Sequence, residues 1–180
     1  MIWFTADTHF RHANIIRYCN RPFGSVEEMD EVLLRNINEC VRPDDTLYHL
    51  GDFALHGRGV EKIRPKIKCR NVTLILGNHD PHSFDGTPTP ALAEHFSKVA
   101  TMMHVTVEVD KQRHLVVLCH YAMRVWPHSH RGSWHLYGHS HGKLPPVPGT
   151  LDVGVDCHDY RPISAHEVAA KRDQPPHYTA

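Results

Sequence analysis

The sequence lacks several features that would place it in a specialised class of protein. Its 180 residues contain no apolar run as long as a membrane span and no basic start followed by a long apolar stretch. Five cysteines, an odd number without C-x-x-C spacing, exclude a disulfide framework and a zinc ribbon. Lys plus Arg and Asp plus Glu number 20 each, so the basic excess typical of proteins that grip long nucleic acid is missing. These absences predict a cytoplasmic protein with reduced thiols, no membrane association and no obligate protein partner.

The chain does have enough apolar sequence for one domain, and it has a surplus of histidine. Hydrophobic residues make up 41% of the sequence, and neither a repeat nor a linker divides it. We therefore expect a single domain over 1–172, followed by a loose tail over 173–180 that contains two prolines. The 18 histidines are not one tract, so a tag does not explain them.

Short apolar runs and helical spacings predict the secondary structure. Strands are expected at 2–6, 46–50, 72–76, 104–109, 113–118, 134–137 and 151–155. Helices are expected at 26–41, near 60–68 and at 164–171. Ser-x-x-Glu capping boxes precede the first and last helix, at Ser25 with Glu28 and at Ser164 with Glu167. Strands alternate with helices in the N-terminal half and pair as hairpins in the C-terminal half. This pattern predicts a mixed α/β architecture with the functional residues on loops at one edge of the sheets.

Polar motifs follow several of these apolar runs, at the point where each run stops. They are Asp7-Thr8-His9, Gly51-Asp52, Gly77-Asn78-His79-Asp80 and Gly138-His139-Ser140-His141, with His120 ahead of the last motif. Each motif alone is also typical of an ordinary turn or surface loop. Their shared position at strand ends predicts that they converge into one site.

The residue types of these motifs suit a binuclear metal site. Histidine offers a nitrogen, asparagine a neutral oxygen, and aspartate two oxygens that can bridge two ions. A mixed set of nitrogen and oxygen ligands suits two divalent transition-metal ions, with manganese preferred and iron, zinc, nickel or cobalt as alternatives. Two adjacent cations generate a nucleophilic hydroxide and keep a net positive charge, so we expect hydrolysis of a phosphate ester.

For several residues beside the motifs, the sequence permits both a functional and a purely structural role. Arg11 and His12 follow the first motif and either contact the substrate phosphate or are simply solvated. Cys119 beside His120 permits a Cys–His nucleophile, but a cysteine that ends an apolar strand is more often a small core residue. No role is assigned to three further histidines, which are His128, His130 and His135.

The ordered set D-x-H, GD, GNHD, H and GHxH resembles the calcineurin-like metallophosphoesterase superfamily, and the match extends from Asp7 to segment 153–156. Segments 4–10, 48–53 and 160–162 are similar to a small branch of this superfamily in bacteria and phages. The chain departs from many relatives at Cys119, where they have glycine. The resemblance implies an α/β fold, a four-layer sandwich of two mixed β-sheets flanked by helices.

The resemblance also implies a role for each motif residue. One metal ion would be bound by Asp7, His9, Asp52 and His141. The other would be bound by Asp52, Asn78, His120 and His139, so that Asp52 bridges the two. His79 would contact the scissile phosphate and protonate the leaving oxygen, with Asp80 orienting His79.

Together these inferences predict a metal-dependent phosphoric ester hydrolase. We expect a phosphodiesterase that cuts a nucleotide or a nucleic-acid end by in-line attack of a metal-bridging hydroxide. A phosphomonoesterase is the alternative, although a short chain without long insertions leaves the site open to larger diesters. An inactive binding module of the same fold is a third reading, which the presence of all seven ligand positions and His79 disfavours.

Overall fold

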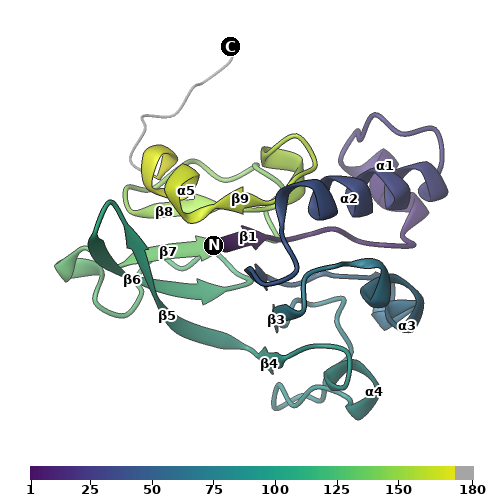
Figure 1. Cartoon of the computed structure of the whole chain (residues 1–180), viewed down its shortest axis with the longest axis horizontal. Coiled ribbons are helices and arrows are strands. Elements are labelled where there is room, and N and C mark those ends of the chain that lie inside the picture. The colour runs from purple at the N-terminus through teal and green to yellow at the C-terminus, as the bar shows by residue number, and fades with distance from the viewer. Residues whose placement is uncertain (173–180) are drawn as a thin grey trace.

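Two β-sheets form the centre of the protein (Figure 1). The structure is a computed structural model that describes residues 1–172, so the tail expected at 173–180 lies outside the described residues. The first sheet has the order β4 (Lys98–Ala100), β3 (Asn71–Ile75), β2 (Thr46–His49), β1 (Ile2–Thr5) and β9 (Ile163–Ser164). The second has the order β5 (Met102–Val109), β6 (Gln112–Cys119), β7 (Trp134–Tyr137) and β8 (Thr150–Asp152).

Both sheets are mixed. Strands β1 to β4 pair in parallel and β9 is antiparallel to β1, whereas β5 and β6 form an antiparallel hairpin and β6, β7 and β8 pair in parallel. The predicted fold class, two mixed sheets flanked by helices, is confirmed. The prediction that the late strands pair as hairpins is wrong for β7 and β8. Their long connections cross over and return in the same direction, which a short apolar run does not reveal.

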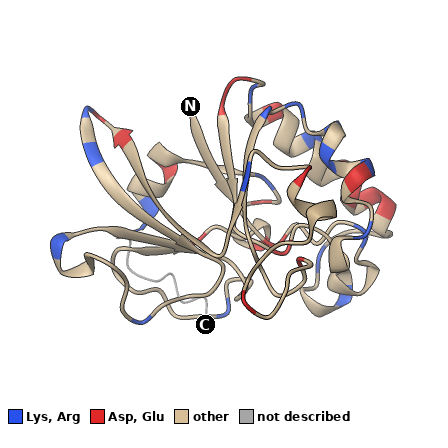
Figure 2. Cartoon of the chain, turned by 90° about the horizontal axis from the view of Figure 1, so that it is seen from below, with Lys and Arg blue, Asp and Glu red and all other residues tan. Residues whose placement is uncertain are grey.

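Five α-helices accompany the sheets in the described part of the chain (Figure 2). They are α1 (Ala13–Tyr18), α2 (Val26–Cys40), α3 (Val60–Ile63), α4 (Pro90–Ala93) and α5 (Ala165–Lys171). Single 3₁₀ turns occupy Leu55–Gly57, Arg64–Lys66, Ser129–Arg131 and Val155–Cys157. Within residues 1–172, none of these helices has the length and apolar character needed to cross a bilayer.

The two predicted helix starts are capped as their sequences indicate, with one difference. Both bonds of the predicted capping box are present at the start of α5. At α2 the Ser25 hydroxyl accepts the amide of Glu28, but the Glu28 carboxylate accepts the amide of Gly24 rather than that of Ser25. The two helices predicted most strongly therefore begin where a side chain satisfies a free backbone amide.

Two apolar cores cover the two faces of the first sheet. Met29, Leu33 and Ile37, spaced four apart on α2, pack on the outer face. Phe4 of β1 points to the other face and packs among residues of the second sheet such as Leu136. Because both faces are covered, the parallel strands read as nearly continuous apolar runs, and each run stops where its strand leaves the core.

Candidate metal centre

Three parallel strands of the first sheet deliver polar side chains to one edge. The amide of Asp7, after β1, donates to the carbonyl of Gly51 at 3.0 Å, and the amide of His9 donates to the carbonyl of Asp52 at 2.9 Å. These hydrogen bonds extend the pairing of β1 and β2 into their loops. The amide of His79, after β3, donates to Oδ1 of Asp52 at 2.8 Å. The carboxylates of Asp7 and Asp52 are consequently buried beside the third loop.

The second sheet delivers imidazoles to the same edge. His120 follows β6, and its Nδ1 donates to the carbonyl of Leu50 at 2.7 Å, which leaves Nε2 as the free acceptor. After β7, the amide of His139 donates to both carboxylate oxygens of Asp7, at 3.1 and 2.9 Å. Glycine is required just before it, because a Cβ at Gly138 would lie 2.6 Å from Oδ2 of Asp7. The edges of the two sheets are thus tied together through Asp7.

The predicted ligands form overlapping groups whose ligand atoms lie within 4.8 Å of one another. Three of the groups are Asp7 with His9 and His141, His9 with Asp52 and His79, and Asp52 with His120 and His139, and a fourth joins His141 to Cys19 and Asp156. The remaining predicted ligand, Asn78, places Oδ1 at 3.3 Å from Nε2 of His120. All seven predicted positions therefore lie in one cluster, and His79 lies within ligand distance as well. Clusters of this composition can hold metal ions.

Contacts at the centre of the cluster are longer than ordinary hydrogen bonds and slightly longer than the spacing of two ligand atoms on one ion. Oδ2 of Asp52 lies 3.5 Å from Nε2 of His9 and 3.6 Å from Nε2 of His120. Two donor atoms at ~2.1 Å from one ion are roughly 3.0–3.4 Å apart. Nε2 of His9 is also buried and has no hydrogen-bond partner within the described residues. A buried ring nitrogen without a hydrogen-bond partner is rare in proteins, and metal coordination is one way to satisfy it.

Five of the predicted ligands have left-handed backbone conformations. Their φ angles are 57° at Asp7, 50° at His9, 55° at Asp52, 65° at His139 and 48° at His141. Such conformations are uncommon for residues other than glycine, and each costs of the order of 1–3 kcal/mol. They persist only where the surrounding structure imposes them, as it does at functional sites. The concentration of these residues in one cluster is an independent sign of function.

Burial and charge set the protonation of the cluster. Burial raises the pKa of Asp7 well above its usual range and lowers the pKa of His9 and of His120, so these two imidazoles are neutral. Burial also opposes the charged form of His141. Hydrogen bonds, above all one to Asp156, and the charge of Asp7 outweigh it and raise the pKa of His141 to about 10. The metal-free cluster therefore holds a proton on His141, where a cation would otherwise supply positive charge.

A buried arginine orients His141. The Arg21 guanidinium donates to both oxygens of Asp156 at 2.8 Å and to the carbonyl of Asp7 at 2.7 Å. The other partner of Asp156 is Nδ1 of His141, at 2.7 Å. This fixes the ring so that Nε2 is left for the cluster. Sequence reasoning missed both residues. Asp156 lies in the last segment of the resemblance, but no local signal marks Arg21.

Asp80 organises loops rather than His79. Its carboxylate accepts the amides of Gly77 and Asp52 at 2.8 Å and of Phe53 at 3.1 Å. Burial raises the pKa of Asp80 to about 7, and these amides oppose that rise. Nδ1 of His79 is buried and has no hydrogen-bond partner in residues 1–172. The expected contact between Asp80 and the His79 ring is therefore not found, and Asp80 instead holds the loops after β2 and β3 together.

His12 lies at the cluster, whereas the contacts of Arg11 lead away from it. The His12 ring is buried, with Nδ1 at 3.4 Å from Nδ1 of His9 and its centroid 5.6 Å from that of His79. The amide of Arg11 donates to Asp30 on α2, and its side chain lies over Gly59.

The three unassigned histidines do not join the cluster. His135 is buried in β7, where Nδ1 bonds to the carbonyl of Val117 at 3.2 Å and Nε2 accepts the amide of Met123 at 3.0 Å. Its role is structural. His128 and His130 are exposed on the connection between β6 and β7.

The fold and this cluster define an α/β protein with a candidate metal-binding edge. No family model matches the chain. It is 31% identical to the "Uncharacterized protein MJ1445" of Methanocaldococcus jannaschii, over 91% of this chain and 86% of that protein. The chain therefore belongs to the same family as MJ1445.

Solved structures are similar in fold. The protein of unknown function AQ665 from Aquifex aeolicus superposes with a TM-score of 0.68 at 24% identity, covering 94% of this chain and 98% of that one. This likeness supports the fold. A structure described as a novel archaeal phosphodiesterase has a TM-score of 0.44 at 17% identity over 85% of this chain and 81% of that one, and is too distant to bear on the function.

Proposed function

We propose that the protein is a metal-dependent phosphoric ester hydrolase of the calcineurin-like metallophosphoesterase superfamily. The observation that carries the proposal is the position of Asp52, whose Oδ2 lies between Nε2 of His9 and Nε2 of His120. One carboxylate oxygen between two imidazole nitrogens is suited to bridging two ions.

The cluster divides into two ligand sets around Asp52. Asp7, His9 and His141 would hold one ion with Asp52, and Asn78, His120 and His139 would hold the other with Asp52. Manganese suits this mixed set, as do iron, zinc, nickel and cobalt. When bound, two adjacent divalent cations activate a water at neutral pH and stabilise negative charge on the phosphate.

Two members of the second ligand set face solvent, which gives a substrate access to the cluster. Asn78 and His139 are exposed, whereas Asp7 and His9 are buried. A phosphate ester would approach from this exposed side, close to His79.

His79 is the residue that we assign to the leaving group. Its ring centroid lies 5.1 Å from that of His9, beside the shared carboxylate of Asp52. Neither the carboxylate of Asp80 nor any other described group engages its Nδ1, so the ring is free to give a proton to the departing oxygen. His12, whose ring contacts the rings of both His9 and His79, would contact the phosphate.

The reaction class is proposed to be diester hydrolysis, on a nucleotide or a nucleic-acid end. The test is to load purified protein with manganese, nickel, cobalt, zinc or magnesium in turn. Each form is then assayed with bis-p-nitrophenyl phosphate and with p-nitrophenyl phosphate. We expect the diester to have the higher kcat/KM. Preference for the monoester would make the protein a phosphatase, and no turnover of either ester with any ion would contradict the proposal.

A further inference from the structure

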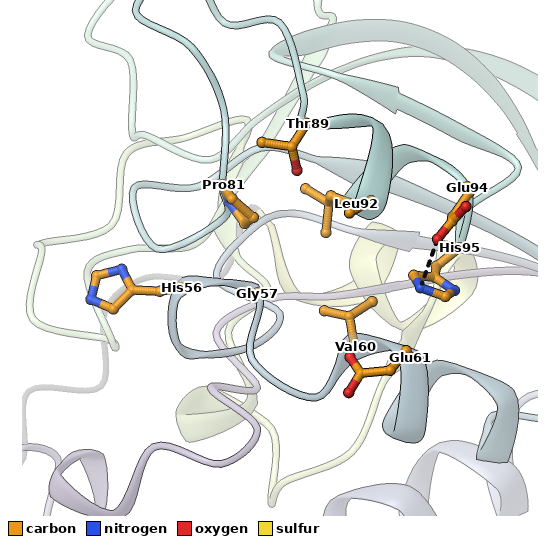
Figure 3. A pocket seen from close by; sticks show the side chains of 10 residues that line it. His56, Gly57, Val60, Glu61, Pro81, Thr89, Leu92, Glu94 and His95 are labelled. Carbon is orange, nitrogen blue, oxygen red and sulfur yellow. Dashed lines mark ion pairs between the residues drawn. The ribbon is translucent and has the colours of Figure 1, made fainter.

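A cavity of about 390 Å³ lies beside the metal-ligand cluster (Figure 3). One wall is formed by the segment after β2, from His56 to Glu61, and the other by the segment after β3, from Pro81 to His95. The size is typical of pockets that hold small organic groups.

The cavity meets the cluster at His56. This residue lines the cavity, and its ring centroid lies 5.6 Å from that of His79. In Figure 3 the His56 ring points away from Glu61 and Glu94, which lie at the other end of the cavity. A group attached to an oxygen at His79 would have room to extend past His56 toward these carboxylates.

The loop at the junction of cluster and cavity is tightly packed. His56 has a left-handed backbone, with φ 50°, and Gly57 follows with φ 69°. A Cβ at Gly57 would lie 2.7 Å from Cγ of Pro81, so this loop fits directly against the segment that carries His79 and Asp80. The position of His56 is consequently fixed by packing rather than left to a loose loop.

The chemistry of the cavity differs from that of the cluster. Val60 and Leu92 are 3% and 2% exposed and contribute apolar surface. Glu61 and Glu94 contribute carboxylates, with His95 at 3.6 Å from Glu94, and no Lys or Arg among residues 1–172 lines the cavity. A ligand in this cavity would contact apolar surface and two negatively charged carboxylates that accept hydrogen bonds. These carboxylates repel an anionic group.

We propose that this cavity holds the leaving group of the substrate and selects a neutral or cationic group over an anionic one. The inference rests on the proposed function. The substrates would be phosphodiesters of a nucleoside or an amino alcohol, whose N–H or O–H donors meet Glu61 and Glu94. A polymer that continues with further phosphates would be excluded.

The chemical step is a simple hydrolysis. Water forms a new P–O bond and loses a proton to solvent, while the P–O bond to the leaving group breaks. His79 gives its proton to the leaving oxygen, so the released group is an alcohol. That alcohol is the part of the substrate placed past His56.

The test compares esters whose leaving groups differ in charge, and comparing their kcat/KM ratio between the wild type and variants cancels their different intrinsic reactivity. The esters are p-nitrophenyl methyl phosphate and analogues with a carboxylate or a trimethylammonium group next to the nitro group. We expect kcat/KM of the wild-type protein to be roughly tenfold lower for the carboxylate ester than for the neutral one. In the double variant Glu61→Gln/Glu94→Gln, that ratio should fall to about twofold or less.

A matched control is Glu108→Gln, since Glu108 is exposed on β5 and does not line the cavity. This variant should keep the wild-type ratio. Equal use of the neutral and carboxylate esters by the wild type, or an unchanged ratio in the double variant, would overturn the inference and leave the proposed function standing. No hydrolysis of any of the esters would overturn both.

Discussion

The two sheets contribute different chemistry to the same cluster. The first supplies the carboxylates of Asp7 and Asp52, buried and held by backbone amides. The second supplies imidazoles. Two of them, His120 and His141, have Nδ1 occupied by Leu50 and Asp156. Among the predicted ligands, both carboxylates thus come from the first sheet, which also supplies the imidazole of His9, whereas the second sheet supplies only imidazoles. Each predicted ligand set combines residues of both sheets, so the cluster depends on their packing.

The largest effect on the proposed metal site is expected from a substitution of Asp52, where the two proposed ligand sets meet. Asp52→Ala removes the shared carboxylate, and we expect both ions to be lost and turnover to fall roughly a thousandfold or more. Elemental analysis and diester hydrolysis measure the two effects. Glu31→Ala, at an exposed position on α2, is the control and should change neither. Two tightly held ions in Asp52→Ala would refute the bridging role.

A smaller loss is expected when the leaving-group residue is changed without touching either ligand set. His79→Ala should lower kcat by about 10²–10⁴-fold and keep the full metal content, because its proton and not its coordination is required. Steady-state kinetics and metal analysis on the same sample separate these roles. Loss of one ion per chain would make His79 a ligand, which its distance allows. Normal turnover would remove it from the mechanism.

A smaller loss of metal affinity is expected from a substitution that affects only the orientation of His141, a ligand from the second sheet. Asp156→Asn keeps an acceptor for His141 but removes the charge that orients its ring and balances Arg21. We expect metal affinity to fall about 10–100-fold, measured by competition with a chelator. Asp159→Asn, at an exposed position three residues on, should leave affinity unchanged. Unaltered affinity in a folded Asp156→Asn variant would show that the network with Arg21 does not position the ligand.

The smallest expected effect is a proton released when metal binds. His141 holds a proton below a pKa of about 10 in the metal-free protein, whereas His9 and His120 are neutral because burial lowers their pKa. Binding near pH 8 should therefore release about one proton from His141, and the release should fade as the pH rises through about 10. Calorimetry in buffers of different ionisation enthalpy measures it. The Asp156→Asn variant should release less of this proton. If the wild-type protein released no proton on metal binding, His141 would not be protonated before the metal binds.

The sequence indicates which polar residues the structure brings together, because local patterns mark them. Apolar runs mark β1, β2, β3, β6 and β7, and the polar motifs stand where those runs stop. The directions of β7 and β8 are not local, since the connecting segments decide them. The short elements α1, β4 and β9 have too few residues for a periodic signal, and packing stabilises them.

The parts of the site that the sequence does not reveal arise from contacts between distant segments. Arg21 meets Asp156 across 135 positions, and nothing near either residue indicates the pair. The left-handed backbone of residues such as Asp7 and His139 is imposed by the hydrogen bonds between loops. The cavity likewise needs the segments after β2 and β3 to face each other, so Glu61 and Glu94 read as ordinary surface residues in the sequence.

The central claim is that the two sheets together hold two metal ions that share Asp52. The most direct measurement is the manganese content and electron paramagnetic resonance spectrum of the manganese-loaded protein. We predict two ions per chain and a spectrum of exchange-coupled manganese, because one carboxylate joins them. One ion or none per chain, or two ions without coupling, would contradict this account.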